Sequence, residues 1–206
     1  MSRGLGDVYK RQVFKMNEKE TGITLTKNLK RQYKDVISDQ LNETPMAGKP
    51  MHIYLTEGPM LPTRVTTARA VPKNMERAAI AAVEDLLKKK VITKVETPTD
   101  WCSPAFFVAK KDSNKVRMVT DFTNLNKYVK RPVHPFPSSE EIMQAVPPDA
   151  KVFAKMDAVH GYFQLAIDEE SSFLTTFLLP SGRYRYLRAP MGLPAQMNGA
   201  DNQISF

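Results

Sequence analysis

The 206-residue sequence contains one cysteine, Cys102. A single thiol excludes an internal disulfide and a zinc cluster built from cysteines. No apolar run approaches the ~18 residues of a membrane span, and the first residues lack the apolar core of a signal peptide. Together these absences predict an intracellular protein with no membrane anchor.

The composition otherwise fits a folded chain rather than a disordered one. Hydrophobic residues make up 42% of the sequence and include ten phenylalanines, enough to build a core. Fifteen prolines are scattered along the chain and indicate many loops. The formal net charge of +8 indicates either a nucleic-acid partner or a surface that is basic for solubility.

The segment SRGLGDVYKRQ, residues 2–12, stands apart from the rest. It is identical to the translation of a DNA adapter used in transposase-based sequencing libraries. We therefore interpret residues 1–12 as an adapter-derived artefact rather than a natural basic leader. This segment has a net charge of +2, and the remaining residues still carry +6.

Apolar spacing predicts two helices in the first half of the chain. Residues 25–41 have apolar side chains at helical spacing. Residues 72–90 form a more regular stripe that begins at Pro72 and ends in three lysines. Because the helix dipole favours cations in the last turn, we interpret these lysines as a helix end rather than a phosphate contact.

Short strands and turns are predicted in the second half. Residues 103–121 indicate a β-hairpin around KDSNK, and residues 175–190 a second hairpin around PSG. Residues 151–157, KVFAKMD, predict a strand that leads into a sharp reversal. Ser138 and Glu141 form a capping box that begins another helix. The pattern predicts an α+β fold.

Four segments carry a family resemblance when they are taken in order. They are SPAFFVAKKDSNKVRMVTDFTNLNK, PFPSSEEI, FAKMDAVHGYFQLAIDEES and TTFLLPSGRYRYLRAPMGL. In this order and spacing they resemble the reverse transcriptase domain of a gypsy-like LTR retrotransposon polyprotein, over roughly residues 50–200. The resemblance implies an RNA-directed DNA polymerase, a nucleotidyltransferase that copies retroelement RNA into DNA. It also implies fingers and a partial ferredoxin-like palm, truncated before the third catalytic motif.

The resemblance gives Asp157 a chemical role. From its position alone, an aspartate at the end of a strand is better interpreted as a cap for the following turn. The matching residue in the family is the first of three catalytic aspartates. Its carboxylate bridges two Mg²⁺ ions, and the carbonyl of Ala158 helps to hold one of them. Such hard cations require oxygen ligands, so the expected cofactor is a pair of Mg²⁺ ions.

Six further residues match substrate contacts of the family: Lys110, Arg117, Tyr162, Phe163, Met191 and Gly192. The two hairpin cations match residues that grip the triphosphate of an incoming dNTP; the alternative is a solvated strand edge. The two rings match those at the sugar, where the first excludes a ribose 2′-hydroxyl; the alternative is a core aromatic. The Met-Gly pair matches the loop beneath the nascent base pair. The expected partners are dNTP, an RNA or DNA template with its primer, and the remainder of a polyprotein.

The sequence also departs from the family. Thr123 stands where the family usually has a template-contacting arginine, and Met191 replaces the more usual Phe or Gln. Residues 195–206 depart from the family's continuation. No Asp-Asp pair occurs anywhere, so the second and third catalytic aspartates are absent. Asp157 alone cannot hold two ions well.

We expect residues 13–55 to be a partly helical segment before the domain, and residues 56–206 to be the reverse transcriptase fingers and partial palm. The chain by itself is expected to be inactive. Two alternatives stay open: a non-enzymatic nucleic-acid-binding relic, and a truncated conceptual translation.

Overall fold

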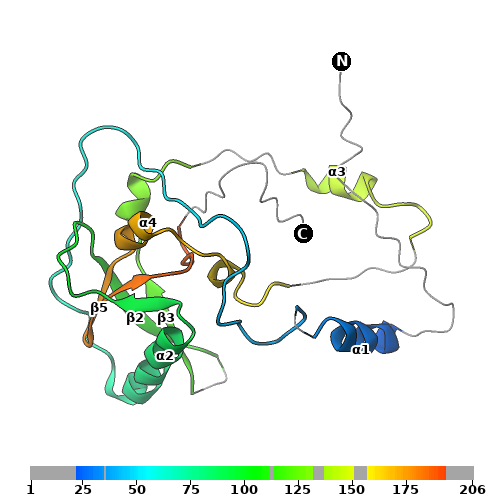
Figure 1. Cartoon of the computed structure of the whole chain (residues 1–206), viewed down its shortest axis with the longest axis horizontal. Helices are drawn as coiled ribbons and strands as arrows, with labels where there is room; N and C mark the ends of the chain where they lie inside the picture. Colours follow the sequence, from blue (N-terminus) through cyan, green and yellow to red (C-terminus); the bar gives the residue numbers. More distant parts are fainter. Residues whose placement is uncertain (1–21, 35, 112–113, 132–136, 151–156, 194–206) are drawn as a thin grey trace. The chain divides into compact units, whose positions relative to one another are not determined.

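The computed structural model describes residues 22–34, 36–111, 114–131, 137–150 and 157–193 (Figure 1). The chain divides into two compact units, Met1–Asp39 and Gln40–Phe206. None of the helices in these ranges combines the length and the apolar composition needed to traverse a lipid bilayer.

The first unit contains helix α1, Gly22–Gln32. The predicted helix over residues 25–41 is therefore wrong in its second half. Val36 and Ile37 are adjacent β-branched residues, which lowers helix propensity. Val36 is also 82% exposed. Because the Val36 side chain is mostly exposed, burial does not stabilise a longer helix here.

A five-stranded sheet organises the second unit, in the order β1-β5-β4-β2-β3. Its strands are β1 (Ile92–Lys94), β2 (Ser103–Ala109), β3 (Val116–Thr120), β4 (Phe177–Leu179) and β5 (Gly182–Tyr186). Only the β2–β4 pairing is parallel among these neighbours. Both predicted hairpins are confirmed, since β2 pairs antiparallel with β3 and β4 with β5.

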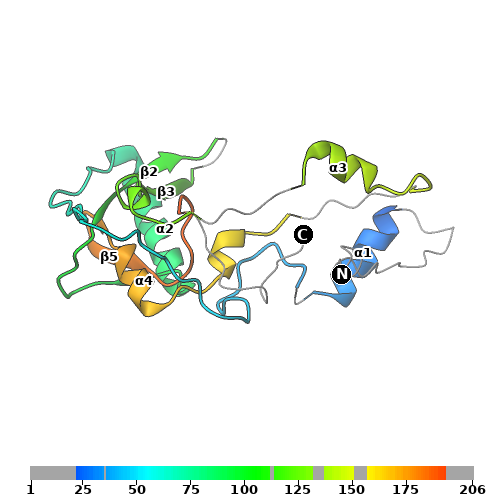
Figure 2. The ribbon, with the colours of Figure 1, turned by 90° about the horizontal axis from the view of Figure 1, so that it is seen from above.

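Two helices of the second unit pack against strands of this sheet. The predicted helix over residues 72–90 is confirmed as a 3₁₀ turn, η2 (Lys73–Met75), followed by α2 (Glu76–Lys88). Helix α2 lies against β3, and the short α4 (Glu169–Leu174) lies against β5, as Figures 1 and 2 show. Helix α3 (Ser139–Gln144) begins with the predicted capping box, in which the Glu141 amide donates to Ser138 Oγ.

The core forms where the sheet meets the helices and loops. Its centre is an aromatic group in which Tyr186 contacts Phe177 at 5.0 Å and Phe122 at 6.1 Å between ring centroids. Val83 of α2 belongs to the same buried cluster. Burial of these large rings is the main favourable contribution to the stability of this unit.

An extended segment, residues 41–56, crosses the second unit and is here called the strap. Its backbone bonds to distant parts of the chain: the Met51 amide donates to the Ala166 carbonyl (2.8 Å), and the Lys130 amide donates to the Tyr54 carbonyl (2.8 Å). Met51 and Ile53 are buried in the core cluster. The predicted boundary between residues 55 and 56 stays a prediction.

Candidate functional site

The turn after Asp157 presents one ring to solvent and packs the next, partly buried, against the core. Asp157 and Ala158 are exposed, and the predicted strand before them lies outside the described residues. His160 adopts a left-handed conformation with φ 49°, and a 3₁₀ turn, η4 (Gly161–Gln164), follows. Tyr162 is 44% exposed, so it is not a core aromatic.

Phe163 anchors this turn to the core. Its ring stacks on His160 at 5.9 Å and on Tyr186 at 6.3 Å between centroids. The Phe163 amide also donates to the His160 carbonyl at 2.7 Å. One ring is exposed and the next is packed because both belong to a tight turn, in which only the second ring contacts the core.

The charges of the hairpin cations act on this turn. Lys110 follows β2 and donates its amide to the Lys115 carbonyl at 3.0 Å, while Arg117 pairs with Val108 across the hairpin. Both cations are exposed. Burial lowers the pKa of His160 below its ordinary value, and the nearby charge of Lys110 lowers it further, as Arg117 does more weakly. The hairpin and the η4 turn therefore share one electrostatic environment.

A third cation follows helix α2 and belongs to the lysine run that the sequence analysis placed at a helix end. Lys89, just after the helix end, also lowers the pKa of His160, while Asp85 opposes it. Lys89 Nζ donates to Asp85 Oδ2 at 2.7 Å, an i,i+4 pair. Its place at the helix end agrees with the sequence interpretation, and its charge also acts on His160 before the η4 turn.

The Met191–Gly192 loop lies on the segment that pairs with the residues after the η4 turn. The Ala189 amide donates to the Leu165 carbonyl at 2.9 Å. Met191 is 54% exposed, and Gly192 has a φ of 93°, which suits glycine. Asn126 Nδ2 donates to the Gly192 carbonyl at 2.7 Å. Of the residues predicted from the sequence, the Tyr162–Phe163 pair and the Met191–Gly192 pair thus lie on adjacent segments.

The described residues do not complete a two-metal site. No three His, Cys, Asp or Glu side chains among them are grouped so that they could hold a metal ion. A hard cation such as Mg²⁺ needs about six oxygen ligands, and Asp157 with the Ala158 carbonyl supplies only part of such a set. That Asp157 by itself cannot hold two ions well stays a prediction.

Asp121 has a structural environment. A hydrogen bond from the Thr123 side chain lowers the pKa of the Asp121 carboxyl, and the Thr123 amide, 3.0 Å from Oδ1, lowers it further. Burial opposes this shift and the charge of Arg69 adds to it. Asp121 therefore closes the turn after β3, and Thr123 serves that turn.

Arg188 is a buried cation that the sequence analysis missed. It is 1% exposed. Its Nη1 donates to the carbonyls of Asn42 (2.8 Å) and Phe163 (3.1 Å), and its Nη2 donates to the Glu43 carbonyl. Burial lowers its pKa. The guanidinium therefore joins the strap to the η4 turn. Its position between Leu187 and Ala189, within a mostly apolar run, was the available signal.

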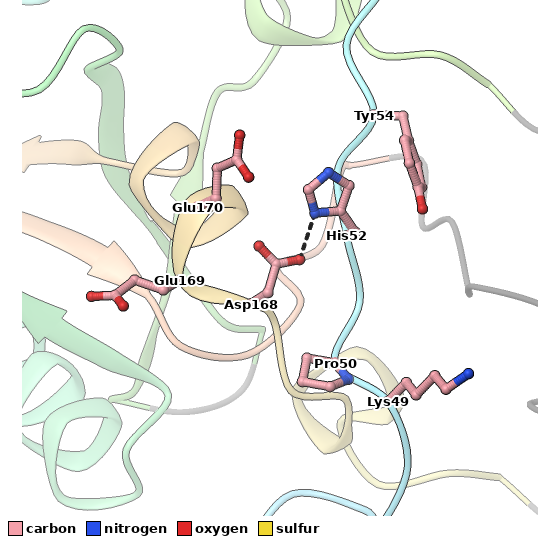
Figure 3. Close-up of a pocket in the computed structure, with 7 residues that line it drawn as sticks. All are labelled: Lys49, Pro50, His52, Tyr54, Asp168, Glu169 and Glu170. Carbon is pink, nitrogen blue, oxygen red and sulfur yellow. Dashed lines mark hydrogen bonds and ion pairs between the residues drawn. The ribbon is translucent and has the colours of Figure 1, made fainter.

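A second polar cluster, also missed, pins the strap at another point. His52 Nδ1 lies 2.8 Å from Asp168 Oδ2 (Figure 3). Ser171 Oγ lies 3.1 Å from the same oxygen. The Ile53 amide donates to Ser171 Oγ at 2.8 Å. Because Ser171 is fully buried, its hydroxyl is not an accessible nucleophile. The cluster is a structural clasp between the strap and α4.

The clasp lines an open pocket. Its walls carry both signs of charge and one tyrosine, and are formed by Lys49, Pro50, His52, Tyr54, Asp168, Glu169 and Glu170 (Figure 3). Burial alone would raise the pKa of Asp168. Hydrogen bonds from the Ser171 amide, from His52 and from the Ser171 hydroxyl outweigh it, and the pKa lies below its ordinary value. Asp168 is therefore held as an anion by groups that also hold the strap.

Known proteins are similar to this chain in sequence. The chain is 33% identical over 129 residues to the retrovirus-related Pol polyprotein from transposon 297 of Drosophila melanogaster, an alignment that covers 59% of the chain and 12% of that polyprotein. No protein-family model matches the sequence.

Solved structures agree. The native prototype foamy virus protease-reverse transcriptase matches 82% of the chain with a TM-score of 0.64 and 23% identity. A foamy viral protease-reverse transcriptase in complex with an RNA/DNA hybrid matches 87% with a TM-score of 0.62 and 19% identity. The chain spans 22% and 23% of those two chains. The chain is therefore homologous to a section of retroelement Pol polyproteins, and it has a reverse-transcriptase-like fold.

Proposed function

We propose that this chain forms the fingers and part of the palm of an RNA-directed DNA polymerase that copies retroelement RNA into DNA. The observation that carries the proposal is that the charges of Lys110 and Arg117 lie near enough to the turn carrying Tyr162, shortly after Asp157, to lower the pKa of His160. The cations suit the anionic triphosphate of a nucleotide, and the exposed ring suits its sugar. The exposed carboxylate suits the metal ions that accompany a triphosphate. One foamy virus relative in the fold comparison was solved with an RNA/DNA hybrid, which supports a nucleic-acid partner.

Each residue has a part in this proposal that follows from its chemistry. Arg117 binds phosphate oxygens through a planar, multidentate donor, and Lys110 binds them as a point charge. The exposed ring of Tyr162 limits the space at the sugar and excludes a ribose 2′-hydroxyl. Phe163 holds that ring in place by packing in the core, because both belong to one 3₁₀ turn.

The remaining parts are supplied by Asp157 and by the Met191–Gly192 loop. Two Mg²⁺ ions, once bound, would activate the primer hydroxyl and stabilise the transferred phosphoryl group. Asp157 and the Ala158 carbonyl would be the ligands from this chain, but the described residues do not complete the set. We therefore expect substrate binding without turnover. The Met191–Gly192 loop supports the nascent base pair through its exposed methionine and its glycine backbone.

The first test is primer extension by the chain with Mg²⁺ and dNTPs on a primed RNA template. We expect no product above background, and efficient extension would contradict the expected inactivity. In parallel, fluorescence anisotropy measures the binding of the labelled primer–template at several salt concentrations. Absence of binding at low salt would refute the proposal.

Charge variants locate the binding surface. Changing Lys110 and Arg117 to alanine removes the two cations assigned to the triphosphate, so the complementary dNTP is expected to bind much more weakly to the complex with the primer–template, while primer–template binding without dNTP is retained. Lys73→Ala is the matched control, because it removes an exposed charge from η2, before the start of α2, that does not contribute to the pKa shift of His160. If the control and the double variant behave alike, the hairpin is not the contact surface.

The alternative is a nucleic-acid-binding relic without a nucleotide site, which the net charge of +6 after residue 12 and the incomplete metal ligand set among the described residues also fit. Adding the dNTP complementary to the template separates the two. A polymerase section is expected to bind the primer–template more tightly with the complementary dNTP than with a mismatched one. A relic is expected to show no such difference.

A further inference from the structure

Asn126 joins two parts of the chain that lie far apart in sequence. It belongs to a 3₁₀ turn, η3 (Leu125–Lys127), shortly after β3. Its Nδ2 donates to the carbonyl of Gly192, 66 residues away, at 2.7 Å. Gly192 is the residue of the loop with a positive φ, 93°. The amide of one turn therefore holds the backbone of another where that backbone adopts an unusual conformation.

The hydrogen bond acts on a short exposed stretch between two buried residues. Arg188 and Pro190 are fully buried, and the Ala189 amide is bonded to the Leu165 carbonyl. Met191 and Gly192 are exposed, and Leu193 is buried again in the core cluster. Asn126 thus supplies a hydrogen bond within the exposed stretch.

The other end of the Asn126 side chain is a buried acceptor without a donor. Among the described residues, Oδ1 of Asn126 makes no hydrogen bond. A buried acceptor left without a partner is destabilising, and it offsets what the Nδ2 hydrogen bond contributes. An asparagine in this environment adds little net stability, but it still sets the position of the Gly192 carbonyl.

We propose that Asn126 is a positioning residue that holds the Met191–Gly192 loop in the conformation that supports the nascent base pair. The inference rests on the proposed function, because only that function gives the loop a substrate. Asn126 does not contact the substrate itself, and it acts through the Gly192 carbonyl.

The first experiment measures the position of the loop without any substrate. The full chain is labelled with ¹³C-methyl methionine, and the Met191 resonance is assigned from its loss in Met191→Leu. Asn126→Ala is expected to shift or broaden the Met191 resonance and to leave that of Met51, which is 3% exposed in the core, unchanged. Asn124→Ala is the matched control: it removes an exposed amide from the same turn, bonded to Lys127 Nζ, and is expected to change neither resonance.

A second variant keeps the test valid if Asn126→Ala fails to fold. Asn126→Asp has the same size but no N–H donor, and it turns a carboxylate toward the Gly192 carbonyl. It is expected to perturb Met191 in the same way. The inference is overturned if Met191 is unchanged in both variants, or if Met51 moves as much as Met191, which would indicate a general loss of structure.

The second experiment adds the primed template and the complementary dNTP. In the unaltered chain the dNTP is expected to shift the Met191 resonance. Asn126→Ala is expected to weaken dNTP binding by about tenfold or more, because small displacements of a binding group are costly, whereas Asn124→Ala is expected to bind normally. No response to dNTP in the unaltered chain would refute the proposed function and leave the first experiment to decide how the loop is held. A normal dNTP affinity in both Asn126 variants would overturn the positioning role.

Discussion

Tyr186 makes the stability of this protein sensitive to alkaline pH. Its hydroxyl lies 3.0 Å from Thr120 Oγ1, and its ring is buried between Phe163 and Phe177. Burial raises the pKa of Tyr186 to about 12, although the hydrogen bond with Thr120 works in the opposite direction. In the unfolded chain the same phenol ionises near its ordinary value of 10.0. We predict that Tyr186→Phe removes this pH dependence.

The magnitude follows from the two pKa values. Because the folded-state pKa is raised, the contribution is fully present below pH 10 and is lost as the pH rises toward 12. The loss is about 1.4 kcal/mol per pH unit, or about 2.7 kcal/mol over the interval. At neutral pH, Tyr186→Phe removes one hydrogen bond and costs about 1 kcal/mol. The free energies of unfolding of the two proteins should therefore become equal at about pH 11.

The assay is urea unfolding followed by circular dichroism, at pH values from 8 to 12. The difference between the two proteins cancels the titration of lysines and of the other tyrosines. Tyr162→Phe, which removes a phenol from a ring that is 44% exposed, serves as the control. A constant difference between the unaltered chain and Tyr186→Phe across the whole range would refute the reasoning.

Three further predictions concern structural contacts. Arg188→Ala leaves three carbonyl groups without a donor and should lower the free energy of unfolding by about 3 kcal/mol or more in urea titrations; Arg188→Lys should restore part of it, and a loss below about 1 kcal/mol would contradict the assigned role. Because the pKa of Asp168 is lowered, its contribution is present above about pH 4 and is lost below it. The stability difference between the unaltered chain and Asp168→Asn should therefore shrink as the pH falls from 6 to 2, and a constant difference would count against the clasp. Ser138→Ala breaks the capping box and should destabilise α3 by about 1 kcal/mol, seen as faster amide exchange in α3 with α2 as the unaffected reference.

The sequence predicted those elements whose determinants lie close together. The helix that begins after Pro72, the capping box of Ser138 and Glu141, and the two hairpins each depend on residues within one short segment. The helix predicted over residues 25–41 was too long, because periodicity does not say whether an apolar stripe will find a surface to cover. The side chain of Val36 is 82% exposed and covers no such surface.

The contacts that arrange the candidate site were not predictable in the same way. Asn126 bonds to Gly192, and Arg188 bonds to Asn42, Glu43 and Phe163. In each case the acceptor is a backbone carbonyl, which every residue possesses, so no side-chain pattern marks the partner. Such contacts appear only when the fold brings distant segments together.

The strap has a consequence for the order in which this protein can form its contacts. His52 bonds to a residue 116 positions later, and Glu43 accepts from a residue 145 positions later. On a ribosome that adds about 5–20 residues per second, the strap must wait roughly 7–30 s for Arg188 to be synthesised. During that interval Met51 and Ile53 have no core to enter, and the extended backbone is open to incorrect pairing. The strap is therefore synthesised well before Asp168 and Arg188, and its contacts with them form late in folding.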